Sequence, residues 1–248
     1  MNLNVSKEHI LFLDIETVPE HQFYGDLSDL QKELFTEKTA YQRKTKPLGE
    51  SEITPEEFYQ RAGIWAEFGK IVCISVGYFA PLGKERSFRI KSFFGDDEGQ
   101  LLQEFKNLLD RHFNHPKHLL CGHNAKEFDF PYIARRMIVH QIALPSKLKL
   151  FGKKPWQIPH LDTMELWKFG DYKNYTSLKL LTMLLGIPSP KEDIDGSQVA
   201  AVYYREQDLK RIAAYCEKDT LAVAQLFLRF NNEPLLTEEE CVFSEPVF

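Results

Sequence analysis

The eight residues 10–17 restrict the fold more than any other stretch of this sequence. They form an apolar run that first meets charge at Asp14 and ends with Glu16 and Thr17. An apolar run of this length is typical of a strand buried on both faces, and acids at its end indicate that it emerges at an open edge. Side chains two apart on a strand point to the same face, so we expect Asp14 and Glu16 side by side.

The other elements follow an order that is typical of an α/β fold. Further strands are expected at residues 70–80, 85–94 and 118–121, the first two joined by a hairpin turn at 81–84. Helices are expected at residues 96–113, 128–140, 162–168, 177–185, 197–203 and 208–230. Strands that alternate with helices in this way predict a mixed central sheet flanked by helices.

Two stretches are expected to stand apart from this pattern. Residues 21–68 are polar, helix-leaning and broken by Pro47 and Pro55, so we expect a helical insertion without a dense apolar core of its own. Residues 231–248 carry five Glu and no basic residue, which predicts a loosely attached acidic tail. The predicted organisation is one domain, 1–230, with the insertion inside it and the tail after it.

Several classes of protein are excluded by what the sequence lacks. No apolar run approaches the roughly 18 residues of a membrane span, and no secretory signal begins the chain, so a cytoplasmic protein is expected. The four cysteines form no CxxC pair, which argues against structural zinc and a disulfide framework. Neither GxGxxG nor a P-loop supports a nucleotide cofactor.

Three groups of acidic residues have the placement that metal chemistry needs, and each has an ordinary structural alternative. Asp14 and Glu16 would repel one another unless a cation lay between them, which favours a metal site. The alternative is that they mark a strand end in solvent. Asp129 lies where a strand passes into a helix, or it caps that helix. Asp219 shares an apolar helix face with Tyr215 four residues earlier, or it belongs to the solvent stripe of the helix.

Taken in order, Asp-x-Glu, Asn-x3-Phe-Asp and Tyr-x3-Asp resemble the motifs of the DEDD 3′–5′ exonuclease superfamily, which has the ribonuclease H-like fold. The tyrosine in the last of these motifs makes the sequence similar to the tyrosine branch of the superfamily (DEDDy). The chain resembles small stand-alone bacterial exonucleases related to the proofreading domain of family B DNA polymerases. Residues 68–78, 177–178, 184–187 and 195–199 agree with that group. The resemblance covers about residues 8–230.

The resemblance implies two divalent cations, Mg²⁺ or Mn²⁺, held by Asp14, Glu16, Asp129 and Asp219. Oxygen ligands alone suit these hard ions better than zinc or copper. Asp14 would bridge both ions, Glu16 and Asp219 would bind the one that carries the attacking water, and Asp129 would help to hold the other. Tyr215 would orient that water, because a phenol with an ordinary pKa of about 10 is a poor base at neutral pH.

Substrate contacts are predicted beside the motifs and on one loop. The residues near the motifs are Thr17, Val18, Asn124, Phe128 and Ser177; core packing is an alternative for Phe128, and a helix cap for Ser177. The loop 147–156 interleaves four lysines with two aromatic residues, so Lys153, Lys154 and Trp156 are predicted to contact a single strand. The alternative is a solvated loop whose rings are tucked against the protein.

We therefore expect a metal-dependent 3′–5′ exonuclease acting on single-stranded DNA 3′ ends. An RNA-trimming enzyme and a catalytically silent nucleic-acid-binding module are the alternatives, and a polymerase or repair protein in trans is an open possibility as partner. The net charge of −5 does not oppose nucleic-acid binding, since residues 1–230 hold 31 of the 36 acids and all 31 bases. Two bound divalent ions would bring that domain to about +4.

Overall fold

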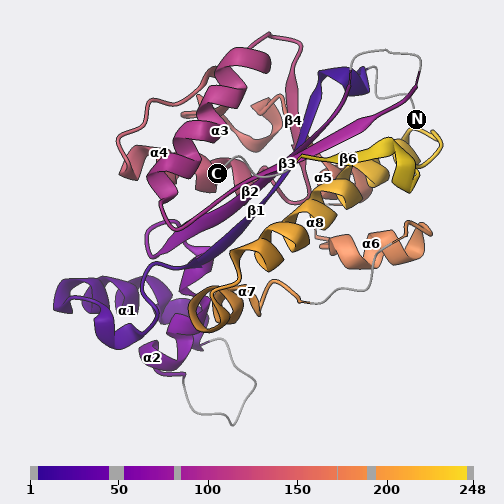
Figure 1. Cartoon of the computed structure of the whole chain (residues 1–248). Coiled ribbons are helices and arrows are strands. Elements are labelled where there is room, and N and C mark those ends of the chain that lie inside the picture. Colours follow the sequence, from indigo (N-terminus) through magenta and orange to yellow (C-terminus); the bar gives the residue numbers. More distant parts are fainter. Residues whose placement is uncertain (1–4, 45–52, 81–84, 172, 189–193, 245–248) are drawn as a thin grey trace.

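A six-stranded mixed sheet forms the centre of the described structure, a computed structural model that covers residues 5–44, 53–80, 85–171, 173–188 and 194–244 (Figure 1). The strand order is β5-β4-β1-β2-β3-β6. β1, β2 and β3 are antiparallel neighbours, β4 and β5 run parallel to β1, and β6 runs parallel to β3. The strands are β1 (Ile10–Pro19), β2 (Gly69–Phe79), β3 (Phe88–Phe94), β4 (Leu119–Gly122), β5 (Leu161–Asp162) and β6 (Cys241–Phe243).

Helices cover both faces of the sheet, and β1 is buried between them. Its odd-numbered side chains, such as Leu11 and Leu13, pack with α3 (Glu98–His112) and α4 (Asp129–Val139). Its even-numbered side chains pack with α8 (Leu209–Phe230) on the opposite face. The strand is therefore apolar on both faces, as the sequence predicted, and the expected α/β architecture is confirmed.

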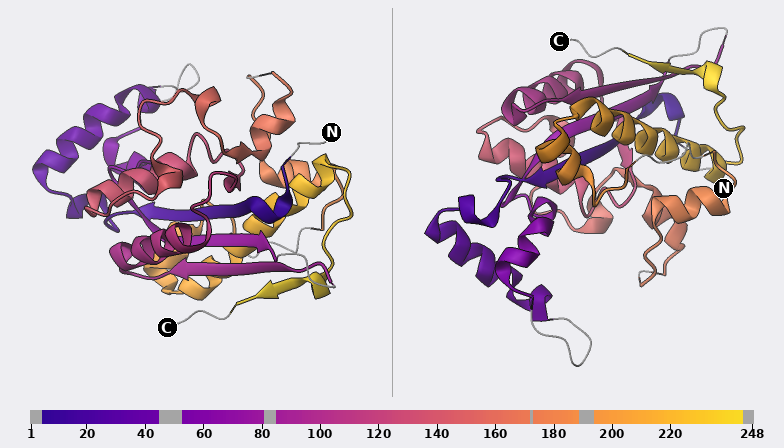
Figure 2. Two further views of the ribbon diagram at one scale, coloured as in Figure 1. Left: turned by 90° about the horizontal axis from the view of Figure 1, so that it is seen from above. Right: turned by 60° about the horizontal axis from the view of Figure 1, so that its bottom comes forward.

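The described residues of the stretch 21–68, which are 21–44 and 53–68, lie at one end of the sheet (Figure 2) and have a small core, contrary to expectation. They contain two 3₁₀ turns (Tyr24–Asp26 and Tyr59–Ile64) and two helices, α1 (Asp29–Lys44) and α2 (Pro55–Phe58). Phe35 is fully buried, with its ring centroid 5.2 Å from that of Phe68. The sequence pattern did not reveal this core because its apolar members occur singly among polar residues: Leu27, Phe35, Phe58, Tyr59, Ala62 and Phe68.

The segment after α8 is attached to the sheet, and the expectation of a loosely held tail is wrong for its described residues. Leu236 is only 7% exposed and packs in the core cluster of α8 and β3. Arg86 donates to both carboxylate oxygens of Glu240 over 2.6–2.7 Å, just before β6 joins β3. The acidic composition hid this attachment because it depends on one buried leucine and on a basic partner far away in sequence.

The remaining elements lie close to their predicted positions. The described part holds α5 (Thr163–Lys168), α6 (Leu178–Leu184) and α7 (Val199–Ala201). The helix expected at 197–203 is shorter than predicted, since α7 passes into a π-helical turn that ends at Gln207 with φ 54°. The predicted hairpin turn at 81–84 lies outside the described residues. None of the described helices combines the length and apolarity that crossing a membrane requires.

Replacing Leu236 by Ala should lower the free energy of unfolding by about 2–5 kcal/mol, the usual cost of a cavity at a buried leucine. Val242→Ala is the matched control, because Val242 is 46% exposed on the same segment and should change stability by less than about 0.5 kcal/mol. Urea unfolding curves of the two variants measure the difference. Equal, small losses in both variants would mean that the segment is detached in solution.

Candidate active site

The candidate site lies in the contact between β1 and α8, which we call the β1–α8 seam. At one end of the seam, Phe12 packs against Phe227, with ring centroids 5.6 Å apart. At the other end, Val18 packs in a cluster with Ile212 and Cys216. The side chains of Asp14 and Glu16 point to the same face as Phe12 and Val18, since they share the period of two. The pair of acids therefore occupies the middle of an apolar contact.

The four predicted carboxylates lie together in this place. Burial raises the pKa of Asp14 well above its ordinary value, and the charges of Glu16, Asp219 and Asp129 raise it further. The pKa of Glu16 is raised by burial and then by Asp219, Cys73 and Asp129. Such mutual effects require the groups to be near one another, so residues from β1, α4 and α8 converge on one site.

Asp129 is fixed at the first turn of α4 and is only 4% exposed. Its carboxylate accepts hydrogen bonds from its own backbone N–H and from that of Ile15, the residue between the two acids of β1. The pairing of β1 with β4 ends at Phe12, so Ile15 lies beyond it. Burial raises the pKa of Asp129 to about 7, although these two hydrogen bonds oppose the shift.

Asp162 holds the loop that leads to Asp129, and its charge adds to the rise in the pKa of Asp129. It caps α5 through Met164, and it accepts backbone hydrogen bonds from Asn124 and Lys126, both at 3.0 Å. Asn124 has a left-handed φ of 62°, and its buried Oδ1 has no hydrogen-bond partner in the described part of the chain. The loop therefore offers an acceptor of fixed orientation beside the site.

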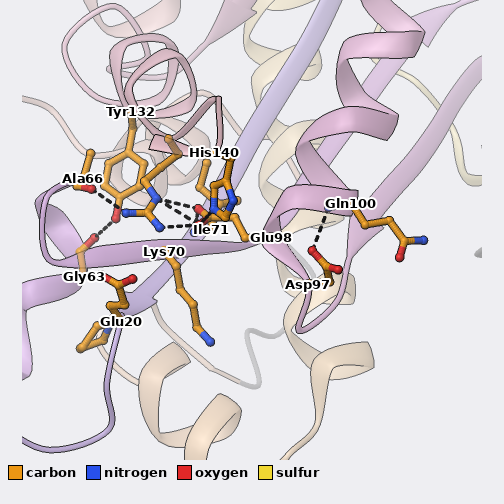
Figure 3. A network of polar contacts seen from close by, with 12 residues as sticks. Glu20, Gly63, Ala66, Lys70, Ile71, Asp97, Glu98, Gln100, Tyr132 and His140 are labelled. Atoms are coloured by element: carbon orange, nitrogen blue, oxygen red, sulfur yellow. Dashed lines mark hydrogen bonds and ion pairs between the residues drawn. The ribbon is translucent and has the colours of Figure 1, made fainter. Parts of the chain in front are cut away.

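A buried ion pair anchors the other end of α4 (Figure 3). Arg136 is 2.6 Å from Glu98 at the start of α3, and both side chains are at most 5% exposed. Arg136 also donates to the carbonyl of Ala66, and Glu98 accepts from the backbone N–H of Ile71 at 2.7 Å and contacts His140. Sequence analysis missed this network, because its members are far apart in the chain and form no motif.

Tyr215 lies one helical turn before Asp219 and donates a hydrogen bond to its carboxylate. Burial raises the pKa of Tyr215, and the charges of Asp219, Glu16 and Asp14 raise it further. The phenol therefore keeps its proton at neutral pH. Both residues line a pocket between α6 and α8, together with Leu178, Lys179, Thr182 and Lys218.

Cys216 is a site residue that sequence analysis did not single out. Its thiol lies 3.4 Å from both the backbone oxygen and Oδ2 of Asp14, to which it donates. The ligand atoms of Asp14, Glu16 and Cys216 lie within 4.8 Å of one another. The sequence feature that could have identified Cys216 is its position inside the Tyr-x3-Asp motif, on the side of the helix that faces the strand. Crowded, buried carboxylate oxygens are a donor set that fits a divalent cation, and the thiol fixes the rotamer of Asp14.

The predicted substrate residues near the motifs differ in their surroundings. Thr17 donates to the hydroxyl of Tyr132, which in turn donates to the carbonyl of Gly63 at 2.8 Å. Val18 is fully buried in the core, so its side chain has no surface for a nucleotide and that prediction fails for it. Val18 fills part of the apolar contact between β1 and α8, and the motif alone does not indicate this contact.

Two of the alternatives left open by the sequence can be compared with the structure directly. Phe128 is half-buried and packs against Tyr132, with ring centroids 5.3 Å apart. Ser177 is exposed and caps α6 by accepting from the N–H of Leu180 at 3.3 Å. The structural roles therefore exist for both residues, and they leave the outer surface of each accessible.

The loop 147–156 presents its rings to solvent. Phe151 is 75% exposed and Trp156 is 80% exposed, so the alternative of tucked rings does not hold. Lys153 and Lys154 are exposed beside them. Lys147 differs from its neighbours, since it is buried and donates to the carbonyl of His115.

Comparison with known proteins defines the family. Residues 64–240 match the family described as "Predicted 3'-5' exonuclease related to the exonuclease domain of PolB". The chain belongs to this family. No curated protein matched it.

A solved structure shares the fold of this family member. The family B DNA polymerase from the hyperthermophilic archaeon Pyrobaculum calidifontis is 15% identical, with a TM-score of 0.51 over 88% of this chain. The chain spans only 24% of the polymerase, so the likeness concerns one part of that protein. The expected ribonuclease H-like fold, with its mixed sheet flanked by helices, is confirmed.

The raised pKa of Asp129 predicts how stability depends on pH when no divalent cation is present. The folded protein holds this proton up to about pH 7, whereas an unfolded aspartate releases it near 3.8. The free energy of unfolding should therefore fall as the pH rises from about 4 to above 7, and Asp129→Asn should remove part of the fall.

Thermal unfolding in chelator, repeated across that pH range, measures this effect. At pH 8 the Asp129→Asn variant should melt higher than the unchanged protein, by about 2–4 °C for each kcal/mol relieved. Asp171→Asn, at an exposed carboxylate, serves as control. Parallel curves for all three proteins would contradict the buried, crowded state of Asp129.

Proposed function

We propose that this protein is a metal-dependent 3′–5′ exonuclease of the DEDDy type that acts on single-stranded DNA. The observation that carries the proposal is the convergence of Asp14, Glu16, Asp129 and Asp219 from three elements, with Tyr215 hydrogen-bonded to the last of them. The family of predicted 3′–5′ exonucleases to which the chain belongs supports the same reaction.

Asp14, Glu16, Asp129 and Asp219 would hold two divalent cations, Mg²⁺ or Mn²⁺. When bound, such ions neutralise phosphate charge and lower the pKa of a water molecule, which then loses a proton more readily and becomes a better nucleophile. The protein's own contribution is to keep four carboxylates close together although they repel, and to fix two of them. The backbone of Ile15 orients Asp129, and the thiol of Cys216 orients Asp14.

Tyr215 would orient the attacking water by a hydrogen bond. Its raised pKa leaves it protonated, so it cannot serve as the base. In the proposed reaction the water releases a proton to solvent and its oxygen bonds to the terminal phosphorus. The bond from that phosphorus to the 3′ oxygen of the preceding nucleotide breaks, and this oxygen takes up a proton from solvent. A nucleoside 5′-monophosphate and a strand shorter by one residue are the products.

The proposed contacts to the terminal nucleotide come from Thr17, Asn124, Phe128 and Ser177. The buried Oδ1 of Asn124 has no hydrogen-bond partner in the described part of the chain, which supports its inclusion. Lys153, Lys154 and Trp156 would contact the strand farther from the site, through phosphates and by stacking. A cytoplasmic place of work and a polymerase or repair protein in trans are proposals that rest on the sequence.

Hydrolysis assays with 5′-labelled single strands of DNA and RNA test the proposal. Stepwise shortening from the 3′ end should occur with Mg²⁺ or Mn²⁺ and stop in chelator. Asp14→Ala and Asp219→Asn should each lose at least about 10³-fold in rate, or about 4 kcal/mol of transition-state stabilisation. Glu217→Gln is the matched control on α8, because Glu217 bonds to Ser92 and lies outside the carboxylate cluster.

The outcome of these assays also separates the alternatives. Full activity of Asp14→Ala would contradict the site, and a preference for RNA would point to the trimming enzyme, since the 2′-OH distinguishes the two substrates. Metal-dependent binding without hydrolysis would instead support the silent module.

Reversing charge in the loop 147–156 should weaken strand binding. Lys153→Glu combined with Lys154→Glu removes two exposed bases, so binding should depend less steeply on salt, because the protein then neutralises fewer phosphates. Fluorescence anisotropy of a labelled oligonucleotide at several salt concentrations measures both effects. Unchanged affinity and slope would exclude the loop from the substrate path.

A further inference from the structure

A second group of exposed aromatic and basic residues lies between α5 and α6, outside the motifs. We call the described residues 168–171 and 173–179 the aromatic arm. Phe169 is 74% exposed and Tyr175 is 68% exposed. The arm also carries Lys168, Lys173 and Lys179 against a single acid, Asp171. This short stretch therefore presents two rings to solvent and carries three lysines, and the proposed function does not yet use them.

The arm is attached to the candidate site on one side through Thr176, the neighbour of Tyr175. Thr176 is only 7% exposed, and its carbonyl accepts a hydrogen bond from His123 Nε2 at 2.9 Å. The other ring nitrogen of His123 lies 2.9 Å from the hydroxyl of Thr163. His123 directly precedes Asn124 in the loop that leads to Asp129. The backbone at Tyr175 is therefore tied to the loop of the second motif.

The other side of the arm lies beside the Tyr-x3-Asp motif on α8. Leu178 and Lys179 line the pocket that Tyr215 and Asp219 also line. The α6 helix lies beside α8 (Figure 1), and their side chains Leu181 and Leu226 pack in one buried cluster. Tyr175 consequently lies one residue from Thr176, which contacts the loop that leads to Asp129, and three to four residues from Leu178 and Lys179, which line the pocket of Asp219.

Phe169 is held in a tight turn rather than on a free loop. It has a φ of 46° at the end of α5, and Gly170 follows with a φ of 93°. The N–H of Asp171 closes the turn by donating to the carbonyl of Lys168 at 2.8 Å. A bulky residue is rarely found in this left-handed region, and here it directs an aromatic ring into solvent.

We propose that Tyr175 and Phe169 are a stacking surface for the unpaired bases of a nucleic-acid strand whose 3′ end occupies the candidate site. The proposal rests on the proposed function and deepens it by assigning two further side chains, outside the motifs, to the binding of the single strand. Every base presents a π-face, and stacking on an aromatic side chain contributes about 1–3 kcal/mol per base. The lysines of the arm match the phosphates between those bases, whereas paired bases in a duplex have no free faces to offer.

Binding of a labelled oligonucleotide to proteins that also carry Asp14→Ala tests the stacking without degradation of the strand. Tyr175→Ala and Phe169→Ala should each weaken the binding of a single strand by about 5–160-fold, the equivalent of the stacking of one base. Tyr175→Phe should bind as tightly as the parent, because stacking needs the ring and not the hydroxyl. Tyr41→Ala is the matched control, since Tyr41 is 79% exposed on α1, and it should have no effect.

A small substrate separates this inference from the proposed function. The 5′-p-nitrophenyl ester of thymidine monophosphate offers a phosphodiester without a strand, so wild type and Tyr175→Ala should hydrolyse it equally. Hydrolysis of the ester together with wild-type strand affinity in both alanine variants would overturn the stacking surface and leave the exonuclease proposal standing.

Two other outcomes are equally decisive. Wild-type protein that cleaves neither the ester nor an oligonucleotide would contradict the exonuclease, while loss of strand affinity in the alanine variants would still support stacking. A dimeric wild type that becomes monomeric in Tyr175→Ala, with strand affinity unchanged, would overturn the inference and make the arm a protein contact. Gel filtration of the same preparations supplies this measurement.

Discussion

The packing of α8 across β1 is the contact on which the arrangement of the site depends. Phe12 and Val18 have no exposed surface, and full burial of such side chains contributes roughly 1.5–3 kcal/mol each. They lie on either side of Asp14 and Glu16, and α8 carries Asp219 between the turns that hold them. Separating the two elements would relieve the repulsion between the acids but would expose these apolar side chains to water. The apolar contact stabilises the fold, and the same contact concentrates negative charge.

The opposite face of the sheet fixes the fourth carboxylate independently. Asp129 is bonded to β1 at one end of α4, and Arg136 is paired with Glu98 near the other end. Breaking such a buried pair typically costs several kcal/mol, because one charge is left without its partner. The site also lies beyond the carboxyl end of β4, where α/β proteins commonly place their ligands. The helices on the two faces of the sheet thus each place carboxylates beside β1.

Local sequence patterns predicted most of this arrangement. The apolar run of β1 and the helix face shared by Tyr215 and Asp219 are both short-range features, and each is present. Long-range contacts were not predictable in this way. Val18 belongs to the core because α8 crosses it, and Leu236 is buried because β6 returns to the edge of the sheet. The sequence around Val18 and around Leu236 contains no pattern that indicates either contact. The chemical roles of the site residues remain predictions.

The buried thiol of Cys216 has a consequence for observing how the protein moves. Three of the four cysteines are buried, and Cys241 alone is partly accessible, at the edge of the sheet. A thiol reagent should therefore label Cys241 quickly and reach Cys216 only when α8 lifts from β1. The rate of the slow labelling phase would then report how often α8 separates from β1. Because the sulfur contacts Asp14, a ligand that holds the β1–α8 seam closed would lower this labelling rate, and its binding could be followed without measuring catalysis.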